Sequence, residues 1–375
     1  MALENIQVIP TAGTSPFQPL RQPLEYSGSL DQYHKIDSTP IIGSEFPNLQ
    51  LTEILDDEEK LRDLAILVSQ RGVIIFRNQK ISIDQQKLLT NKLGELTGRP
   101  ETSKLHKHIL VNAQIGELVN DSNGLPDDEV ALITSKVSKG LLPKLQGTKR
   151  PQAKPFLNPS RLTPSNHIAA EFWHSESICY ENIPADYAVM QMLENPPSGG
   201  DTLFASGYEV YDRMSRPMRS MLETLTAVHS EENLVRDAPK GYNFDIIGAR
   251  GSPSNVGFDL TVTHPLVRTN PVTGWKSLYG VAPRVKRGGI QGVTKHESDI
   301  LYQYIHSLVA QNHDLQVRVK WNNNDIGIWD NRSTYHVETN DFNEYRRGYR
   351  TLSVGEKPYF DPASKSRREA LASAT

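Results

Sequence analysis

Three copies of a short His-x-Glu pattern are the residues of this sequence best suited to chemistry: His174/Glu176, His229/Glu231 and His336/Glu338. On a β-strand, residues i and i+2 point to the same side, so both side chains of one copy can reach a single ion. Two histidines and one carboxylate on one face of iron(II), with the other face open, are typical ligands of non-haem oxygenases. With 44 acidic residues and 11 histidines in the chain, some copies are expected by chance, so their neighbours must separate them.

The neighbours favour the first copy and the histidine of the third. His174 lies among aromatic and apolar residues in the segment 172–178, and His336 ends an apolar, β-branched run. His229 follows a predicted helix and precedes the polar residues 231–233, so we expect it to be a surface or capping residue. The residues alone leave two interpretations open: a metal site of His174, Glu176 and His336, or hydrogen-bonded histidines packed beside aromatic rings.

Three arginines follow His336 within fourteen residues: Arg346, Arg347 and Arg350. A guanidinium forms two parallel charge-assisted hydrogen bonds to a carboxylate. Residues four apart on a strand share a face, so Arg346 and Arg350 would point into one cavity, and Arg347 would point away. One arginine would hold a carboxylate and the other a second anion.

The diacid 2-oxoglutarate fits this arrangement, because it chelates iron through its 2-oxo and C1-carboxylate groups and leaves its C5-carboxylate to be clamped. A hydroxyl from Thr202 would add a hydrogen bond to the same carboxylate, whichever arginine holds it. The alternative is a basic surface cluster paired with Asp341 and Glu344, which would constrain the structure little.

The composition is that of a globular protein, with 37% hydrophobic and 23% charged residues. A net charge of -3 gives no general footprint for nucleic acid or an anionic membrane. The single cysteine, Cys179, excludes a disulfide framework within the chain. Residues 1–18 lack a signal-peptide pattern, and no run of about eighteen apolar residues occurs. We expect a cytoplasmic protein with a small-molecule substrate and with neither a nucleic-acid nor a membrane partner.

Short strands separated by turn signals predict a mainly β fold with flanking helices (α+β). The predicted strands are 73–76, 187–193, 202–205, 315–321, 325–329 and 349–354, with a hairpin formed by 260–269 and 275–280. The predicted helices are 56–70, 84–96, 211–225 and 297–311, and in the last of these Ile300, Tyr304 and Leu308 should form the apolar face.

The predicted organisation is an N-terminal arm (1–33), one domain (34–360) and a C-terminal tail (361–375). A lid-like insertion covers about 102–170, and its part from Lys136 to Arg161 is basic without an acidic residue. This part is interpreted as a solvated lid or as a cover that attracts an anionic substrate. Nucleic-acid binding is the least favoured alternative, because Phe156 is its one interleaved aromatic residue. The arm leaves a homo-oligomer possible.

Several motifs together resemble the taurine/2-oxoglutarate dioxygenase family, and most of all its fungal sulfonate dioxygenase-like branch. These motifs are Trp173-His174-Ser175-Glu176, Gly199-Gly200-Asp201-Thr202-Leu203, the stretch from Trp329 to His336, and the pair Arg346/Arg350. The resemblance runs from about Gly72 to Phe360. It implies a double-stranded β-helix (jelly-roll) core.

The resemblance also implies roles for single residues. Fe(II) would be held by His174, Glu176 and His336, which leaves Glu338 without a role as a ligand. The co-substrate 2-oxoglutarate would be held by Thr202 and Arg346, and the substrate would be faced by Arg350 and by His106 or His108. The family's usual carboxylate ligand is aspartate, and here it is the longer Glu176.

The leading hypothesis is an Fe(II)- and 2-oxoglutarate-dependent dioxygenase that uses O2 to hydroxylate an aliphatic C–H bond of a small anionic substrate, a sulfonate or a carboxylate. Succinate and CO2 would be released. A catalytically silent jelly-roll binding module is one alternative, with Glu176 marking a decayed site. A metal-dependent isomerase or hydrolase is another, and it would leave Thr202 and Arg346 unexplained.

Overall fold

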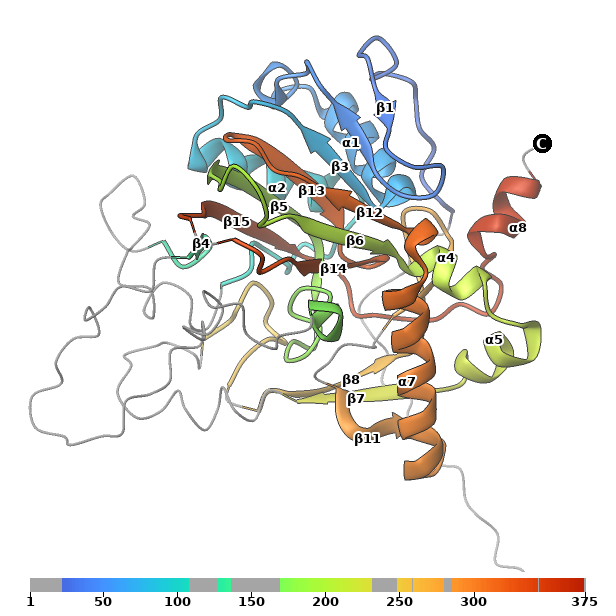
Figure 1. Cartoon of the computed structure of the whole chain (residues 1–375). Helices are drawn as coiled ribbons and strands as arrows, with labels where there is room; N and C mark the ends of the chain where they lie inside the picture. The colour runs from blue at the N-terminus through green and yellow to red at the C-terminus, as the bar shows by residue number, and fades with distance from the viewer. Residues whose placement is uncertain are drawn as a thin grey trace, which may run out of the picture.

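Two β-sheets packed face to face form the centre of the computed structural model (Figure 1). The structure describes residues 22–107, 127–135, 169–230, 248–257, 259–279, 285–342 and 344–373, without the side chains of 285–288. The larger sheet has seven strands in the order β1-β2-β3-β13-β5-β15-β4. These strands are β1 (Ile36–Asp37), β2 (Ser44–Phe46), β3 (Val73–Phe76), β13 (Asp325–Asp330), β5 (Ala185–Glu194), β15 (Arg347–Val354) and β4 (Ala131–Thr134). The sheet is mixed, because β2 and β3 are parallel and the other pairs are antiparallel.

The second sheet has three antiparallel strands, in the order β12 (Gln316–Val319), β6 (Thr202–Ser206) and β14 (Thr334–Glu338). Its Phe204, Val317 and Val319 pack against Val73 and Ile75 of the large sheet, in a buried cluster between the two layers. His336 lies opposite Phe204 in the register of β14 and β6. Because opposite residues share a face, His336 points into the space between the sheets.

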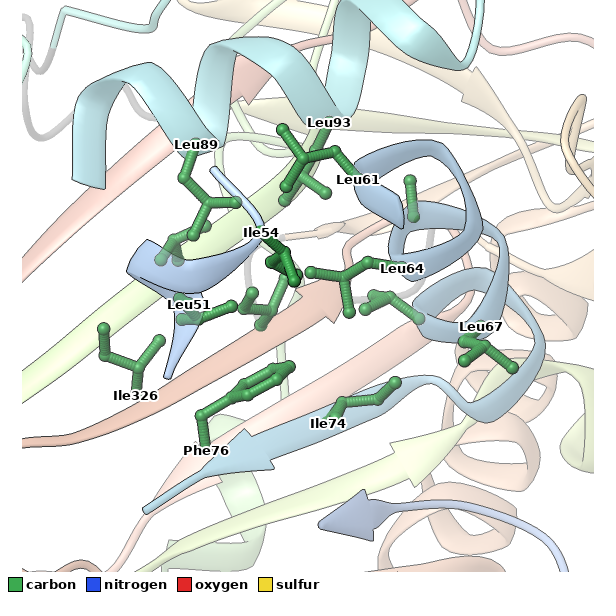
Figure 2. Close-up of a cluster of buried hydrophobic side chains, with 14 of the residues drawn as sticks. Leu51, Ile54, Leu61, Leu64, Leu67, Ile74, Phe76, Leu89, Leu93 and Ile326 are labelled. Carbon is green, nitrogen blue, oxygen red and sulfur yellow. The ribbon is translucent and has the colours of Figure 1, made fainter. Parts of the chain in front are cut away.

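The outer face of the large sheet is covered by α1 (Glu58–Arg71) and α2 (Ile83–Leu96), as Figure 2 shows. Ile74 and Phe76 of β3 face these helices, whereas Val73 and Ile75 face the second sheet, as the period of two in a strand requires. Asp57 caps α1, and Gly72, with a φ of 76°, follows its last residue. Both predicted helices and the predicted strand between them are confirmed.

A third sheet has three strands, β11 (Val285–Gln291), β7 (Thr226–Ser230) and β8 (Thr261–Pro265), and it packs against α7 (Lys295–Gln311). The hairpin β9 (Val267–Thr269) and β10 (Lys276–Leu278) is antiparallel, as predicted. The shorter elements are the 3-10 helices η1 (Leu51–Glu53), η3 (Ala169–Phe172) and η5 (His313–Leu315) and the helices α4 (Gly207–Asp212), α5 (Arg216–Leu222) and α8 (Arg367–Ala372).

Two predicted elements are divided in the structure. The helix predicted over 211–225 is wrong, because the chain forms α4 and α5 and then enters β7. The break follows from Pro217 in the first turn of α5, since proline is tolerated at a helix start but not in a helix interior. The strand predicted over 260–269 is divided at Leu266 into β8 and β9, which belong to different sheets.

The helix α7 is confirmed, and Tyr304 and Leu308 pack partly buried against the core, but the centre of the apolar face lies one residue further along than the predicted series. Leu301, Ile305 and Val309 are buried, whereas Ile300 is 52% exposed. The predicted series that begins at Ile300 and the buried series that begins at Leu301 have the same i, i+4, i+8 spacing. The spacing alone therefore could not show which series forms the centre of the apolar face. We expect Ile305→Ala to lower the free energy of unfolding by about 2–4 kcal/mol and Ile300→Ala by less than about 0.5 kcal/mol in urea unfolding. Equal losses would contradict the buried face.

The predicted domain boundaries stay predictions, although parts of each flanking region have a described structure. Leu30 in the predicted arm is buried in the cluster with α1. Within the predicted insertion, residues 127–135 contain β4, which pairs with β15 at the sheet edge, whereas the basic part 136–161 lies outside the described residues. The predicted tail contains α8, and its Arg368 forms an ion pair with Glu209 of α4. No helix of the described part of the chain is long and apolar enough to cross a membrane.

Candidate metal centre and co-substrate site

The side chains of His174, Glu176 and His336 converge on one point. Each offers one ligand atom, and these atoms lie within 4.8 Å of one another. His174 and Glu176 follow η3, and His336 lies in the middle of β14. Two imidazoles and a carboxylate at this distance could hold one divalent transition-metal ion.

The backbone joins the two histidines directly. The N–H of His174 donates to the carbonyl of His336 at 3.0 Å, and the N–H of His336 donates to the carbonyl of His174 at 2.8 Å. The two residues therefore form a bridge between β14 and the segment after η3. Their ring centroids are 4.2 Å apart, so the spacing of the imidazoles is set by main-chain hydrogen bonds.

The hydrogen bonds of His174 select the nitrogen that is available to a metal. Nδ1 lies 2.8 Å from the carbonyl oxygen of Phe172, so it carries the hydrogen and donates. Nε2 then keeps its lone pair. Desolvation and the neighbouring imidazole of His336 lower the pKa of His174 to about 4, so the ring is neutral at pH 7. A neutral imidazole is the form that binds metal.

The carboxylate of Glu176 is held in its ionised form. Burial would raise its pKa, but Arg350 and His336 outweigh burial and hold the pKa of Glu176 well below its usual range. His336 Nε2 lies 3.2 Å from Glu176 Oε1, and Arg350 Nη1 donates to the same oxygen. Arg350 is therefore engaged with the candidate ligand carboxylate.

Asn331 fixes the main chain of Glu176. Its Oδ1 accepts from the N–H of Glu176 at 2.6 Å, and its Nδ2 donates to the carbonyls of Glu176 and Ala185, both at 2.9 Å. The side chain is fully buried in the turn between β13 and β14. The same turn is stabilised by Arg332, whose guanidinium donates two hydrogen bonds, both of 2.9 Å, to the carboxylate of Asp330.

We expect Asn331→Ala to loosen Glu176, because it leaves one buried N–H and two buried carbonyls without their partner. The free energy of unfolding should fall by about 2–4 kcal/mol, and the affinity for a divalent metal by about 10–100-fold. Urea unfolding and a cobalt(II) titration measure the two effects. A variant that loses stability but binds cobalt(II) like the wild type would contradict this role of Asn331.

Arg346 and Thr202, the residues predicted to bind the co-substrate, are both buried. Arg346 is 5% exposed, and its Nε and Nη2 have no hydrogen-bond acceptor among the described residues. Its Cδ packs so closely on the turn before β6 that a Cβ at Gly200 would lie 3.3 Å from it. Burial lowers the pKa of Arg346, and the carboxylates of Glu338 and Asp201 oppose this effect.

The strand register relates this pair to the histidines. Thr202 lies opposite Glu338, two residues along from the pair formed by Phe204 and His336. Two residues of a strand span about 7 Å, and alternate residues share a face. A ligand that is bound near His336 can thus extend along β6 to Thr202.

The structure separates Arg346 from Arg347 as strand alternation predicts. Arg347 Nη2 donates to the hydroxyl of Tyr349 at 3.1 Å, and its guanidinium lies over the Tyr349 ring. Tyr349 packs with Val130 and Leu132, away from the space between the two sheets. Of the two neighbouring arginines, Arg346 is the one whose side chain packs on Gly200 and senses the charge of Glu338.

Of the two histidines expected to face the substrate, His106 lies within the described residues and His108 does not. His106 is buried, and its Nε2 lies 2.9 Å from Glu181 Oε1. Arg250 donates to both carboxylate oxygens of Glu181, at 2.7 and 2.9 Å, so His106 belongs to a buried ionic network. His108 lies outside the described residues.

The prediction that His229 is a surface residue is wrong. His229 is fully buried in β7, the middle strand of the third sheet, and its ring centroid lies 5.7 Å from that of His264 on β8. His229 lies within a strand rather than after a helix, and Ala227 and His229 are the buried residues of its alternating pattern, so the side chain faces inward with Ala227. His229 is not part of the candidate metal cluster.

This buried histidine pair should make stability sensitive to acid. Burial, together with His229 and Arg268, lowers the pKa of His264 to about 3, whereas an unfolded histidine has a pKa of about 6.5. Between these values the unfolded chain binds more protons, so the free energy of unfolding falls as the pH is lowered. We expect His264→Gln to weaken the pH dependence of urea unfolding between pH 7 and pH 5, and His296→Gln at the exposed start of α7 to leave it unchanged. An unaltered slope in His264→Gln would exclude this pair as the cause.

Sequence reasoning missed Asn331 and Trp321 as residues that support the site. Asn331 stands within the motif from Trp329 to His336, and its signal is a polar residue between two buried strands. Trp321 Nε1 donates to Thr202 Oγ1 at 2.9 Å, and nothing in the sequence pairs these two residues.

Comparison with known proteins identifies the family of this chain. The family model described as "Taurine catabolism dioxygenase TauD, TfdA family" matches residues 34–353. The alpha-ketoglutarate-dependent dioxygenase btcD of Neocamarosporium betae is 44% identical over 366 residues, covering 94% of this chain and 99% of that protein. The alpha-ketoglutarate-dependent sulfonate dioxygenase of Saccharomyces cerevisiae is 31% identical over 326 residues, covering 86% of this chain and 67% of that protein.

The fold is shared with solved structures. The crystal structure of a taurine dioxygenase from Burkholderia xenovorans superposes with a TM-score of 0.59 at 23% identity, covering 87% of this chain and 90% of that one. The matched region of the family model contains both sheets except the last residue of β15, and all residues of the candidate site. The chain therefore belongs to the TauD, TfdA family of 2-oxoglutarate-dependent non-haem iron dioxygenases.

Proposed function

We propose that this chain binds Fe(II) through His174, Glu176 and His336, and uses 2-oxoglutarate and O2 to hydroxylate an aliphatic C–H bond of a small molecule. The observation that carries the proposal is the convergence of two imidazoles and one carboxylate within 4.8 Å. The donor set fits Fe(II), since imidazole and carboxylate suit this ion and a two-histidine, one-carboxylate face leaves positions open. The bound iron would supply the redox chemistry that activates O2, with succinate and CO2 as co-products.

The protein's own residues hold this centre in place. Phe172 keeps the hydrogen of His174 on Nδ1, and Asn331 fixes the main chain of Glu176. Glutamate is one methylene longer than the family's aspartate. This length lets the carboxylate contact both His336 and Arg350 while its backbone stays clamped. Glu176 therefore fits the role of a ligand.

The distal carboxylate of 2-oxoglutarate is assigned to Arg346 and Thr202. Arg346 offers two buried donors without a protein acceptor among the described residues, and Thr202 is buried on β6, two residues after the Gly200 on which Arg346 packs. A buried donor pair without an acceptor favours an anionic ligand. This pair is the feature that a hydrolase or isomerase without an oxo-acid would leave unexplained.

The two facing sheets support the proposal of a jelly-roll core. The metal-binding histidine of β14 and the Thr202 end of β6 both lie between them. For the substrate we keep the proposal of a small anion, with Arg350 as its partner, because this guanidinium lies at the metal-binding carboxylate. An anionic substrate would then share Arg350 with Glu176.

The test is anaerobic addition of Fe(II) and 2-oxoglutarate, which should give a weak visible charge-transfer band. Succinate should then form in air with a panel of sulfonates and carboxylates. A silent binding module would bind metal or oxo-acid without succinate formation. The absence of both the band and succinate would overturn the proposal.

A further inference from the structure

The indole of Trp321 lies directly behind the proposed co-substrate clamp. Trp321 is 4% exposed and Thr202 is 1% exposed, so their hydrogen bond is shielded from water. The donor–acceptor distance between Trp321 Nε1 and Thr202 Oγ1 is 2.9 Å. Trp321 follows β12, whose last residue, Val319, lies opposite Thr202 in the sheet.

The direction of this hydrogen bond has a chemical consequence. An indole N–H only donates, so Thr202 Oγ1 must be the acceptor. The hydroxyl rotates about the Cβ–Oγ bond, and with one lone pair taken by the indole its hydrogen must point elsewhere. The described residues offer no acceptor for that hydrogen. Thr202 is thus held as a donor, two residues after the Gly200 on which Arg346 packs, and two donors of Arg346 also have no acceptor among the described residues.

Burial alone does not account for the bond. Trp329 is packed in the same cluster, and its indole nitrogen has no hydrogen-bond partner among the described residues. The core therefore accommodates one indole without an acceptor, whereas Trp321 is aimed at a hydroxyl on the wall of the proposed site.

The side chain of Trp321 and the turn that carries it are held rigidly by packing and by hydrogen bonds. Its ring packs so closely on β13 that a Cβ at Gly327 would lie 2.6 Å from it. The next residue, Asn322, donates its backbone N–H to the carboxylate of Asp325 at 2.8 Å. Asp325 in turn forms an ion pair with Arg77 at 2.6 Å, so the turn that carries the indole is tied to both sheets.

We propose that Trp321 is a positioning residue that turns the Thr202 hydroxyl hydrogen toward the distal carboxylate of 2-oxoglutarate. This inference rests on the proposed function, since it needs 2-oxoglutarate at Arg346 and Thr202. Trp321 acts through Thr202, and the set of donors at the clamp becomes complete only when both residues are present. The role predicts an effect confined to ligands that have a distal carboxylate.

The experiment measures ligand binding by calorimetry on the Fe(II)-loaded protein under argon. Trp321→Phe removes the N–H, and Trp321→benzothienylalanine removes it while keeping the shape of the ring. Each variant should bind 2-oxoglutarate about tenfold more weakly than the wild type. Pyruvate has the same 2-oxo-acid head but no distal carboxylate, and its affinity should be unchanged. Trp275→Phe, on the hairpin of β9 and β10, is the matched control and should bind both acids like the wild type.

A double-mutant cycle separates positioning from packing. In a Thr202→Val background, Trp321→Phe should cause no further loss of 2-oxoglutarate affinity, because the hydroxyl it acts on is gone. Additive losses, equal weakening of pyruvate, or unaltered 2-oxoglutarate binding in the benzothienylalanine variant would each overturn the inference. Failure of the wild type itself to bind 2-oxoglutarate would instead overturn the proposed function.

Discussion

Replacing His336 with alanine should abolish turnover and leave a folded protein that no longer retains iron(II). The imidazole is one of three candidate ligands, whereas its structural link to His174 runs through the backbone and survives the substitution. Even changes to groups that only orient a ligand cost about 10–100-fold in metal affinity, so we expect a larger loss here. Metal content after dialysis and succinate formation measure the outcome.

Glu338→Gln is the matched control for this experiment. Glu338 completes the third His-x-Glu copy, but it lies outside the cluster of ligand atoms. The variant should retain iron like the wild type. Loss of iron in Glu338→Gln, or its retention in His336→Ala, would show that a different set of residues holds the metal.

Arg346→Ala should raise the concentration of 2-oxoglutarate needed for half-saturation on the order of a hundredfold, with metal content unchanged. The variant removes the buried guanidinium donors that have no protein acceptor among the described residues, so a carboxylate loses charge-assisted bonds. Arg347→Ala is the control one residue along, and its guanidinium lies on Tyr349 instead. A metal defect in Arg346→Ala, or a matching effect of Arg347→Ala, would contradict the assignment.

Local patterns in the sequence were sufficient for much of this architecture. The strand at 73–76 has the predicted bounds, and α1 begins and ends within two residues of its prediction because Asp57 and Gly72 mark its ends. The three candidate metal ligands were also chosen from their neighbours. A cap, a glycine or a β-branched run acts over a few residues, and the sequence displays it directly.

The remaining features depend on contacts between distant segments. Asn331 clamps Glu176, and Trp321 donates to Thr202, from far away in the chain. Neither spacing nor composition encodes such a pair. The burial of His229 has the same origin, because a polar-looking strand becomes interior only when another strand and a helix cover it. The partner of Arg350 likewise follows from the placement of β15 near the segment after η3.

The backbone bridge between His174 and His336 also bears on how the protein folds. It closes a very long loop, and the entropy of that closure is lost when the two segments pair. Contacts of this kind form slowly, so the bridge should appear late in folding. The amides of both histidines should then exchange slowly with deuterated water in the protein without added metal. Iron would thus bind to a preformed site, and chelators should remove the iron without unfolding the protein.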